Sequence, residues 1–230
     1  MKGKRIIVTG AYGVLGSAVI HLLADRGARV AAVDRANEAP ATFSQAPGEE
    51  VLLVGGCDLT DPVAAERAVN DAVGHFGGLD GLVNVAGGFA WETLAQGDPA
   101  TWDRMWALNV KTCANVCRAA APHLERSGGR IVNVGAGAAV KAAAGMGAYA
   151  ASKSGVHRLT EALAEELKGR VAVNAVLPSI IDTPANRADM PTVDPSKWVS
   201  PHDLAEVIAF LLSDAAKAVT GALLPVNGGV

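Results

Sequence analysis

The sequence has no excess of basic residues, and this bears first on what the protein binds. Among its 230 residues, 20 Lys and Arg stand against 23 Asp and Glu, giving a formal net charge of −3. A polyanion is held chiefly by a cationic surface, which this balance does not supply. Nucleic acid is therefore not expected as a partner. Because half of the residues are hydrophobic, we expect one domain with one sizeable core over residues 1–230.

Long apolar runs are also missing. The longest weakly polar stretch, residues 138–151, is interrupted by Lys141, Gly145, Gly147 and Tyr149 and contains hardly any Leu or Ile, so it does not predict a membrane span. Near the N-terminus, the apolar run at residues 6–8 is much shorter than the core of a secretory signal. We therefore expect a cytoplasmic protein with no membrane partner.

Cysteine and histidine are too few and too scattered to indicate a metal centre. Cys57, Cys113 and Cys117 have the spacing of no common zinc or disulfide framework, and the five histidines show no metal-binding pairs. We predict no metal and three free, buried thiols, as is typical of a reducing compartment. Aromatic residues make up only 4% while glycine occurs 26 times, which favours helices packed closely on a sheet.

Short apolar runs alternate with helical periods along the chain. Strands are predicted at residues 5–9, 28–33, 50–54, 79–85, 130–134, 171–176 and 222–226, and helices at residues 14–26, 62–76, 99–126, 148–168 and 201–212. Apolar strands without polar alternation belong in a sheet covered on both faces. With right-handed crossovers this predicts a doubly wound α/β fold of Rossmann type, with about seven parallel strands. Residues 182–200, rich in proline and without a helical period, are expected to form a substrate lid loop.

The turn after the first predicted strand contains glycines at Gly10, Gly13 and Gly16. Glycines at such a turn let the backbone approach a pyrophosphate and seat the next helix, whose N-terminus faces the phosphates. Asp34 follows the second strand, where a carboxylate binds the adenosine ribose and repels a 2′-phosphate. We therefore predict NAD(H) in preference to NADP(H), although the adjacent Arg35 would suit the 2′-phosphate of NADP(H).

Tyr149 and Lys153 are four residues apart in a predicted helix and so share one face. An ammonium beside a phenol favours the ionised phenol and lowers its pKa toward neutrality. The pair is therefore predicted to supply the proton that accompanies a hydride. Such a pair also occurs by chance in many helices, so its context decides the interpretation.

Together these motifs resemble the short-chain dehydrogenase/reductase family over nearly the whole chain. The resemblance also includes Asp58, the segments 84–87 and 107–110, Pro178 with Thr183, and the segments 219–221 and 227–229. It implies Tyr149 as the proton donor, Lys153 as its pKa-lowering partner and ribose contact, and Asn109 as the anchor of a water-linked proton relay. The cofactor-binding residues that it implies are Gly10, Tyr12, Gly13, Val14, Leu15, Gly16, Asp34, Arg35, Asp58, Leu59, Asn84, Ala86, Gly87, Tyr149, Lys153, Pro178, Ile181 and Thr183.

Two departures from the family pattern narrow the function. The second glycine of the turn is one position earlier than usual, and Ala136 stands where the family has its catalytic serine, thirteen positions before the tyrosine. Loss of that hydroxyl costs on the order of 10²-fold or more with an ordinary ketone. The dihydropteridine reductase branch is similar in both respects. A quinonoid pterin, already electrophilic, accepts hydride without such a hydroxyl. Phe89, Ala136, Met190 and Trp198 are then the predicted substrate-binding residues.

Two other functions stay open at this point. One is a carbonyl or 3-oxoacyl reductase or alcohol dehydrogenase in which another group replaces the serine. The other is a cofactor-binding protein that no longer catalyses. The resemblance also implies a homodimer or homotetramer that pairs the helices at residues 99–126 and 148–168, where Ala114, Ala119 and Ala162 allow close approach.

Overall fold

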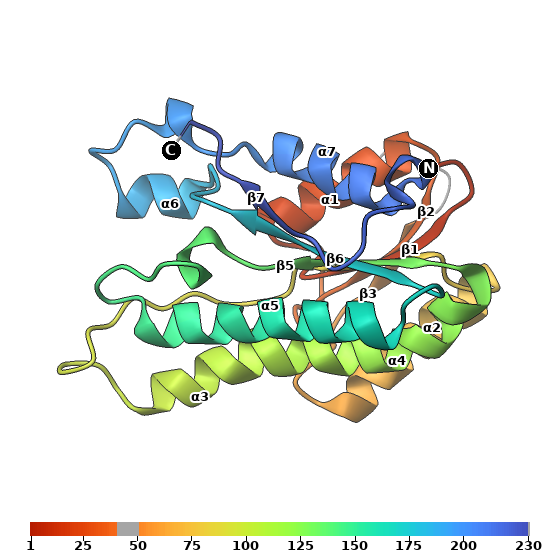
Figure 1. Cartoon of the computed structure of the whole chain (residues 1–230), viewed down its shortest axis with the longest axis horizontal. Coiled ribbons are helices and arrows are strands. Elements are labelled where there is room, and N and C mark those ends of the chain that lie inside the picture. The colour runs from red at the N-terminus through yellow and green to blue at the C-terminus, as the bar shows by residue number, and fades with distance from the viewer. Residues whose placement is uncertain (41–50, 230) are drawn as a thin grey trace.

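A seven-stranded parallel sheet forms the centre of the protein (Figure 1). The computed structural model describes residues 1–40 and 51–229. The strands are β1 Arg5–Thr9, β2 Arg29–Val33, β3 Val51–Val54, β4 Gly81–Asn84, β5 Arg130–Val134, β6 Ala172–Pro178 and β7 Leu223–Val226. Their order in the sheet is β3-β2-β1-β4-β5-β6-β7, which confirms the doubly wound α/β prediction. The direction of winding reverses between β1 and β4, so a crevice opens there at the carboxyl ends of the strands.

Helices cover both faces of this sheet. They are α1 Val14–Asp25, α2 Pro62–Phe76, α3 Ala100–Trp106, α4 Thr112–Ser127, α5 Gly147–Glu166, α6 Pro184–Asp189 and α7 Pro201–Leu212. Figure 1 shows α1 and α7 on one face and α2, α4 and α5 on the other. Within β1, Ile6 and Val8 pack into the core beneath α1 and α7, while Ile7 packs into the core beneath α2 and α4. Burial on both faces explains why the strands are apolar throughout.

Several predicted boundaries need correction. The helix predicted at residues 99–126 is α3 and α4 joined by a π-helical turn at Ala107–Lys111. β4 is shorter than predicted, and Glu50, the predicted start of the third strand, lies outside the described residues. The segment 182–200 is not wholly a loop, because it contains α6 and a short 3₁₀ turn at Pro195–Lys197. α6 starts at Pro184, and the Thr183 hydroxyl caps it by accepting the Asn186 amide.

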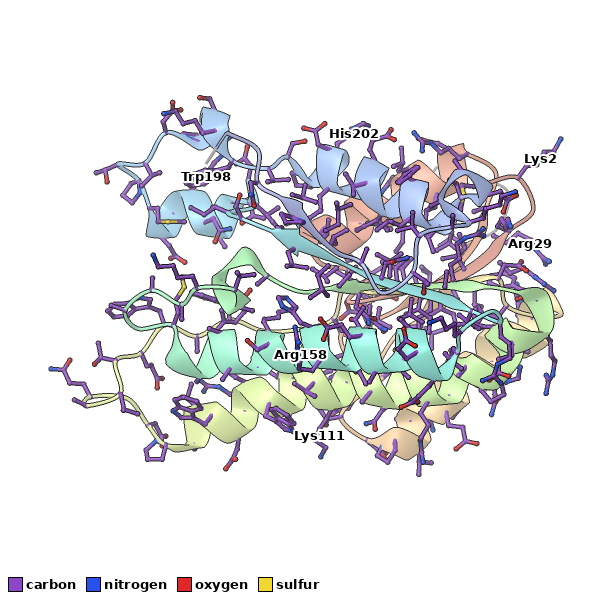
Figure 2. The ribbon with its side chains drawn as sticks, viewed as in Figure 1. Lys2, Arg29, Lys111, Arg158, Trp198 and His202 are labelled. Atoms are coloured by element: carbon purple, nitrogen blue, oxygen red, sulfur yellow. The ribbon has the colours of Figure 1, made fainter. Side chains whose placement is uncertain are left out.

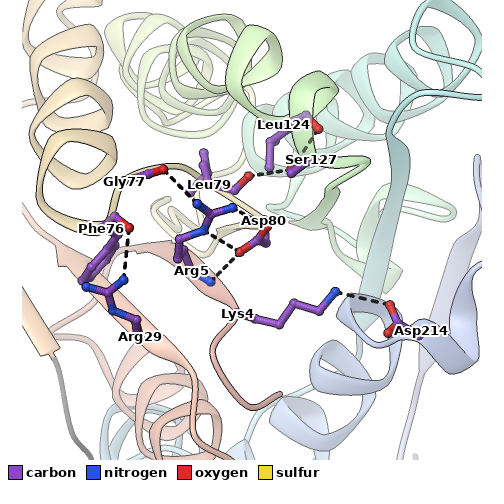
Figure 3. A network of polar contacts seen from close by, with 10 residues as sticks. All are labelled: Lys4, Arg5, Arg29, Phe76, Gly77, Leu79, Asp80, Leu124, Ser127 and Asp214. Carbon is purple, nitrogen blue, oxygen red and sulfur yellow. Dashed lines mark hydrogen bonds and ion pairs between the residues drawn. The ribbon is translucent and has the colours of Figure 1, made fainter.

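A polar network ties the amino ends of β1 and β4 together (Figure 3). The Arg5 guanidinium donates two hydrogen bonds to the Asp80 carboxylate, Nε to Oδ2 at 2.7 Å and Nη2 to Oδ1 at 2.8 Å. Its Nη1 also donates to the Gly77 carbonyl at 2.9 Å, at the end of α2. Bidentate pairs of this kind are geometrically specific. These hydrogen bonds fix the amino ends of β1 and β4, at the edge of the sheet opposite the crevice.

Within residues 1–40 and 51–229, none of the helices combines the length and the apolar character needed to cross a bilayer.

Candidate active site

A large cavity of about 1670 Å³ lies at the carboxyl ends of the strands. Most residues predicted for the cofactor and substrate line it. These are Gly10, Tyr12, Gly13, Val14, Leu15, Gly16, Asp34, Arg35, Asp58, Leu59, Ala86, Gly87, Phe89, Ala136, Tyr149, Lys153, Pro178, Ile181, Thr183 and Met190. The fold thus brings together residues that are up to 180 positions apart in the sequence, Gly10 and Met190. Asn84, Asn109 and Trp198 are not among the lining residues.

The glycine turn is packed so tightly that two of its glycines admit no side chain. Gly10 has a positive φ of 62°, and a Cβ there would lie 2.8 Å from the Ala86 amide nitrogen. A Cβ on Gly16 would overlap the Gly10 carbonyl oxygen. Gly13 is less crowded, since its Cβ would lie 3.4 Å from that same oxygen. It precedes α1, whose first amides have no side-chain cap and open toward the cavity.

Carboxylates close the side of the cavity beside β2 and β3. Asp34 accepts the Tyr12 amide at 2.9 Å and the Ala36 amide at 3.0 Å, so a single side chain joins the glycine turn to the end of β2. Asp58 accepts both the amide and the hydroxyl of Thr60, and these hydrogen bonds hold its pKa below the usual value. Asp58 is therefore ionised at neutral pH.

Tyr149 and Lys153 both lie in the first half of α5 and line the cavity. The Lys153 ammonium donates to the Val134 carbonyl at 2.8 Å, and burial lowers its pKa to about 8. Burial also raises the pKa of Tyr149 to about 12. The expected lowering of the phenol pKa by Lys153 is thus not seen, because desolvation outweighs it and the ammonium is directed at β5. Tyr149 is protonated at neutral pH, as a proton donor must be.

Asn109 lies beneath the cavity wall, inside the π-helical turn. Its side chain accepts the Gly88 amide at 2.9 Å and donates to the Gly88 carbonyl at 3.1 Å. It also donates to the Ser152 hydroxyl at 2.9 Å, which in turn donates to the Tyr149 carbonyl at 2.7 Å. Sequence reasoning missed Ser152, although it stands beside Lys153 in the motif. The contacts show Asn109 positioning the loop after β4 against α5, and its role in a proton relay stays a prediction.

Asn84 lies below the site. Its Nδ2 donates to Asn133 Oδ1 at 2.9 Å and to Cys117 Sγ at 3.2 Å, inside a buried polar cluster. The side-chain amide of Asn84 thus faces Asn133 and Cys117, and the role of Asn84 in cofactor binding stays a prediction. All three cysteines are free and buried, as predicted. The hydrogen bond with the neighbouring Cys113, together with burial, raises the pKa of the Cys117 thiol.

Three of the four residues predicted to bind substrate line the cavity: Phe89, Ala136 and Met190. The ring of Phe89 stands edge-on to Tyr149, with centroids 4.9 Å apart. Trp198 is not among the lining residues and lies buried next to the C-terminal turn, where Gly229 donates its amide to the Lys197 carbonyl at 2.9 Å. Its contact with substrate stays a prediction. Figure 2 shows Trp198 near α6, on the side of the sheet that α7 covers. Trp91 and Met146, which the sequence did not predict, also line the cavity. Trp91 could have been proposed from its position two residues after Phe89.

Within residues 1–40 and 51–229, no group of three or more His, Cys, Asp and Glu side chains is placed to bind a metal ion.

Comparisons with known proteins agree with this geometry. Residues 4–194 match the family described as short chain dehydrogenase. The chain is 34% identical to D-threitol dehydrogenase of Mycolicibacterium smegmatis, covering 100% of this chain and 93% of that protein. It is 32% identical to a 3-oxoacyl-(acyl-carrier-protein) reductase of Thermotoga maritima, covering 100% and 98%. A 3-ketoacyl-(acyl-carrier-protein) reductase from Brucella melitensis, solved with NADH, has a TM-score of 0.88 and 30% identity, covering 99% and 98%. The chain belongs to the short-chain dehydrogenase/reductase family and is an oxidoreductase.

Proposed function

We propose that this protein is a cytoplasmic, NAD(H)-dependent reductase that transfers hydride to a small conjugated ring, a quinonoid dihydropterin or a quinone. One observation carries the proposal. A protonated Tyr149 and the methyl group of Ala136 line the same cavity, so the site has a proton donor and lacks the hydroxyl that polarises an ordinary carbonyl. A substrate that is already electrophilic needs only the proton.

Several residues that line the cavity support NAD(H) as the cofactor. Gly10 and Gly16 make a turn that only glycines allow, and the open amides of α1 face the position of a pyrophosphate. Asp34 would accept the ribose hydroxyls and repel a 2′-phosphate. Arg35 is exposed beside it, so NADP(H) is the alternative. When bound, NAD(H) supplies the hydride.

Tyr149 and Lys153 would then carry out the proton transfer that accompanies the hydride. Tyr149 Oη holds it at neutral pH because burial keeps the phenol neutral. Lys153 stays cationic below a pKa of about 8 and would bind the ribose while stabilising negative charge that develops on the phenol. Phe89 and Met190 would cover the flat faces of the substrate and exclude water.

A second function is favoured by the relatives. D-threitol dehydrogenase and the 3-oxoacyl-(acyl-carrier-protein) reductases act on alcohols or carbonyls, so this chain would be a carbonyl or 3-oxoacyl reductase or an alcohol dehydrogenase. A water or a backbone amide would then replace the missing serine. The remaining alternative is a protein that binds NAD(H) but catalyses no reaction. The retention of Tyr149, Lys153 and Asn109 argues against it.

The test combines a cofactor titration with a substrate panel. NADH and NADPH are titrated by fluorescence, and we expect NADH to bind about tenfold more tightly because Asp34 repels the 2′-phosphate. Oxidation of NADH is then followed with quinonoid dihydropterin, menadione, acetoacetyl-CoA and cyclohexanone. We expect the first two to be turned over best. Ala136→Ser, which restores a hydroxyl, should raise kcat/KM for the ketones by about tenfold or more and leave the pterin rate nearly unchanged.

Other outcomes select the alternatives. Good turnover of a ketone by the wild-type protein, with none of pterin or quinone, rejects the proposed substrate class and supports the second function. NADH binding without turnover of any substrate supports the silent protein. Tighter binding of NADPH than NADH assigns the 2′-phosphate to Arg35.

We also propose that the protein is a homodimer or homotetramer. Trp102 and Trp106 of α3 are 44% and 50% exposed, on the layer that α4 and α5 also form, and a second copy would bury them. We expect light scattering to give two or four times the 23.4 kDa chain mass. Trp106→Glu should shift the mass toward the monomer, because a buried unpaired charge is costly. A wild-type protein of monomeric mass would reject the proposal.

A further inference from the structure

His157 is a buried histidine one turn beyond Lys153 on α5, and the mechanism above does not use it. Its side chain lies against the end of β5, and the residue is only 3% exposed. The Ala136 amide donates to His157 Nε2 at 3.3 Å. Because Nε2 is the acceptor, a neutral ring carries its proton on Nδ1.

Neighbouring residues at the end of β5 and on α5 support the hydrogen bond between His157 and Ala136. A Cβ on Gly135 would overlap the His157 imidazole, so glycine at that position leaves room for the ring. One turn earlier on α5, Lys153 donates to the Val134 carbonyl at 2.8 Å. Two side chains of one helix face thus hold residues 134 and 136, on either side of Gly135. The segment they hold is the cavity wall that carries Ala136.

We propose that His157 is a positioning residue, which holds the Ala136 backbone against α5 and so keeps Lys153 and the cavity wall in their working geometry. The inference rests on the proposed hydride transfer and names a residue that acts on it from behind the site. A displacement of about 1 Å in such a wall is enough to slow a reaction by as much as 10²-fold.

Because His157 can be protonated, the hydrogen bond that holds the cavity wall at Ala136 should depend on pH. The charged groups acting on His157 are Lys153 and Arg158, both on α5. Gly135 and Ala136, which follow β5, and Leu177 of β6 bring no ionisable side chain. Burial, Arg158 and Lys153 all lower the pKa of His157 below 6.5. The ring is therefore neutral at pH 7 and accepts the bond. Protonation at lower pH turns Nε2 into a donor and breaks the bond.

The experiment compares His157→Leu, which removes the acceptor, with His157→Gln, whose amide oxygen reaches a similar position. His202→Gln on the exposed start of α7 is the matched control. The probes are NADH, by fluorescence titration, and the best substrate of the panel. For His157→Leu we expect kcat about tenfold lower, substrate KM within about twofold of wild type, and NADH affinity several-fold weaker. His157→Gln should restore both kcat and NADH affinity to within about threefold, and should lack the acid limb of the wild-type pH profile.

Imidazole NMR of the wild-type protein supplies a readout that needs no substrate. We expect a His157 ring with Nε2 unprotonated and a titration below pH 6.5. The inference is overturned if His157→Leu binds NADH and turns over substrate like wild type, if Gln fails to rescue while both variants unfold at the wild-type temperature, or if Nε2 carries the proton at pH 7. A wild-type protein that turns over nothing would reject the proposed function alone, because NADH affinity and NMR still decide the role of His157.

Discussion

Tyr149→Phe is expected to lower kcat by ~10²–10⁴-fold, the usual contribution of a positioned proton donor. The substitution removes only the phenol oxygen and keeps the ring that stands edge-on to Phe89. Because burial holds the phenol neutral, the loss should be nearly constant from pH 6 to 8 rather than follow a titration of Tyr149. Steady-state kinetics with the best substrate of the panel, at several pH values, measures it.

Measurements of NADH affinity and unfolding temperature show whether the loss of kcat in Tyr149→Phe is catalytic or structural. The NADH affinity and unfolding temperature of Tyr149→Phe should stay close to wild type, since the variant has no new cavity and no unpaired buried group. An unchanged kcat would show that another group supplies the proton. A large loss of NADH affinity would show instead that Tyr149 chiefly binds the cofactor.

Gly16→Ala is expected to abolish high-affinity NADH binding and to destabilise the protein. The added Cβ would overlap the Gly10 carbonyl and lie 2.9 Å from Ala11 Cα, and both neighbours are backbone atoms. α1 must therefore shift away from β1, which costs about 1–3 kcal/mol as overpacking does. For a chain of this size that corresponds to a loss of several degrees in Tm. We expect NADH affinity to fall more than tenfold, because the amides of α1 move with the helix.

Gly74→Ala is the matched control. Gly74 lies on the exposed side of α2, and a Cβ there would meet nothing within 4 Å. Alanine in a helix interior is favoured over glycine by roughly 0.5–1 kcal/mol, so this variant should unfold at a slightly higher temperature and bind NADH unchanged. Normal NADH binding by Gly16→Ala would mean that the turn is loose enough to admit a side chain, against the packing described above.

The order of strands and helices could be predicted because it depends on local patterns. Apolar runs bounded by glycine indicate β1, β4 and β5, and the helical period of residues 62–76 indicates α2 with its boundaries. Boundaries failed where tertiary contacts set them. The π-helical turn at Ala107–Lys111 places Asn109 on Gly88 and Ser152, and neither partner is visible in the helical period. α6 was missed although Thr183 and Pro184 are a good helix start, because six residues are too few to show a period.

The candidate site divides in the same way. The sequence by itself determined the glycine turn, the pair Tyr149 and Lys153 and the missing hydroxyl at Ala136, since each is a matter of residue type at short spacing. Only the tertiary structure decided which groups meet across the sheet: Lys153 with Val134, His157 with Ala136, and Asn84 with Asn133 below the cavity. Those contacts depend on strand order and on how α5 is seated. Burial then set the pKa of Tyr149 against the direction that its spacing from Lys153 had indicated.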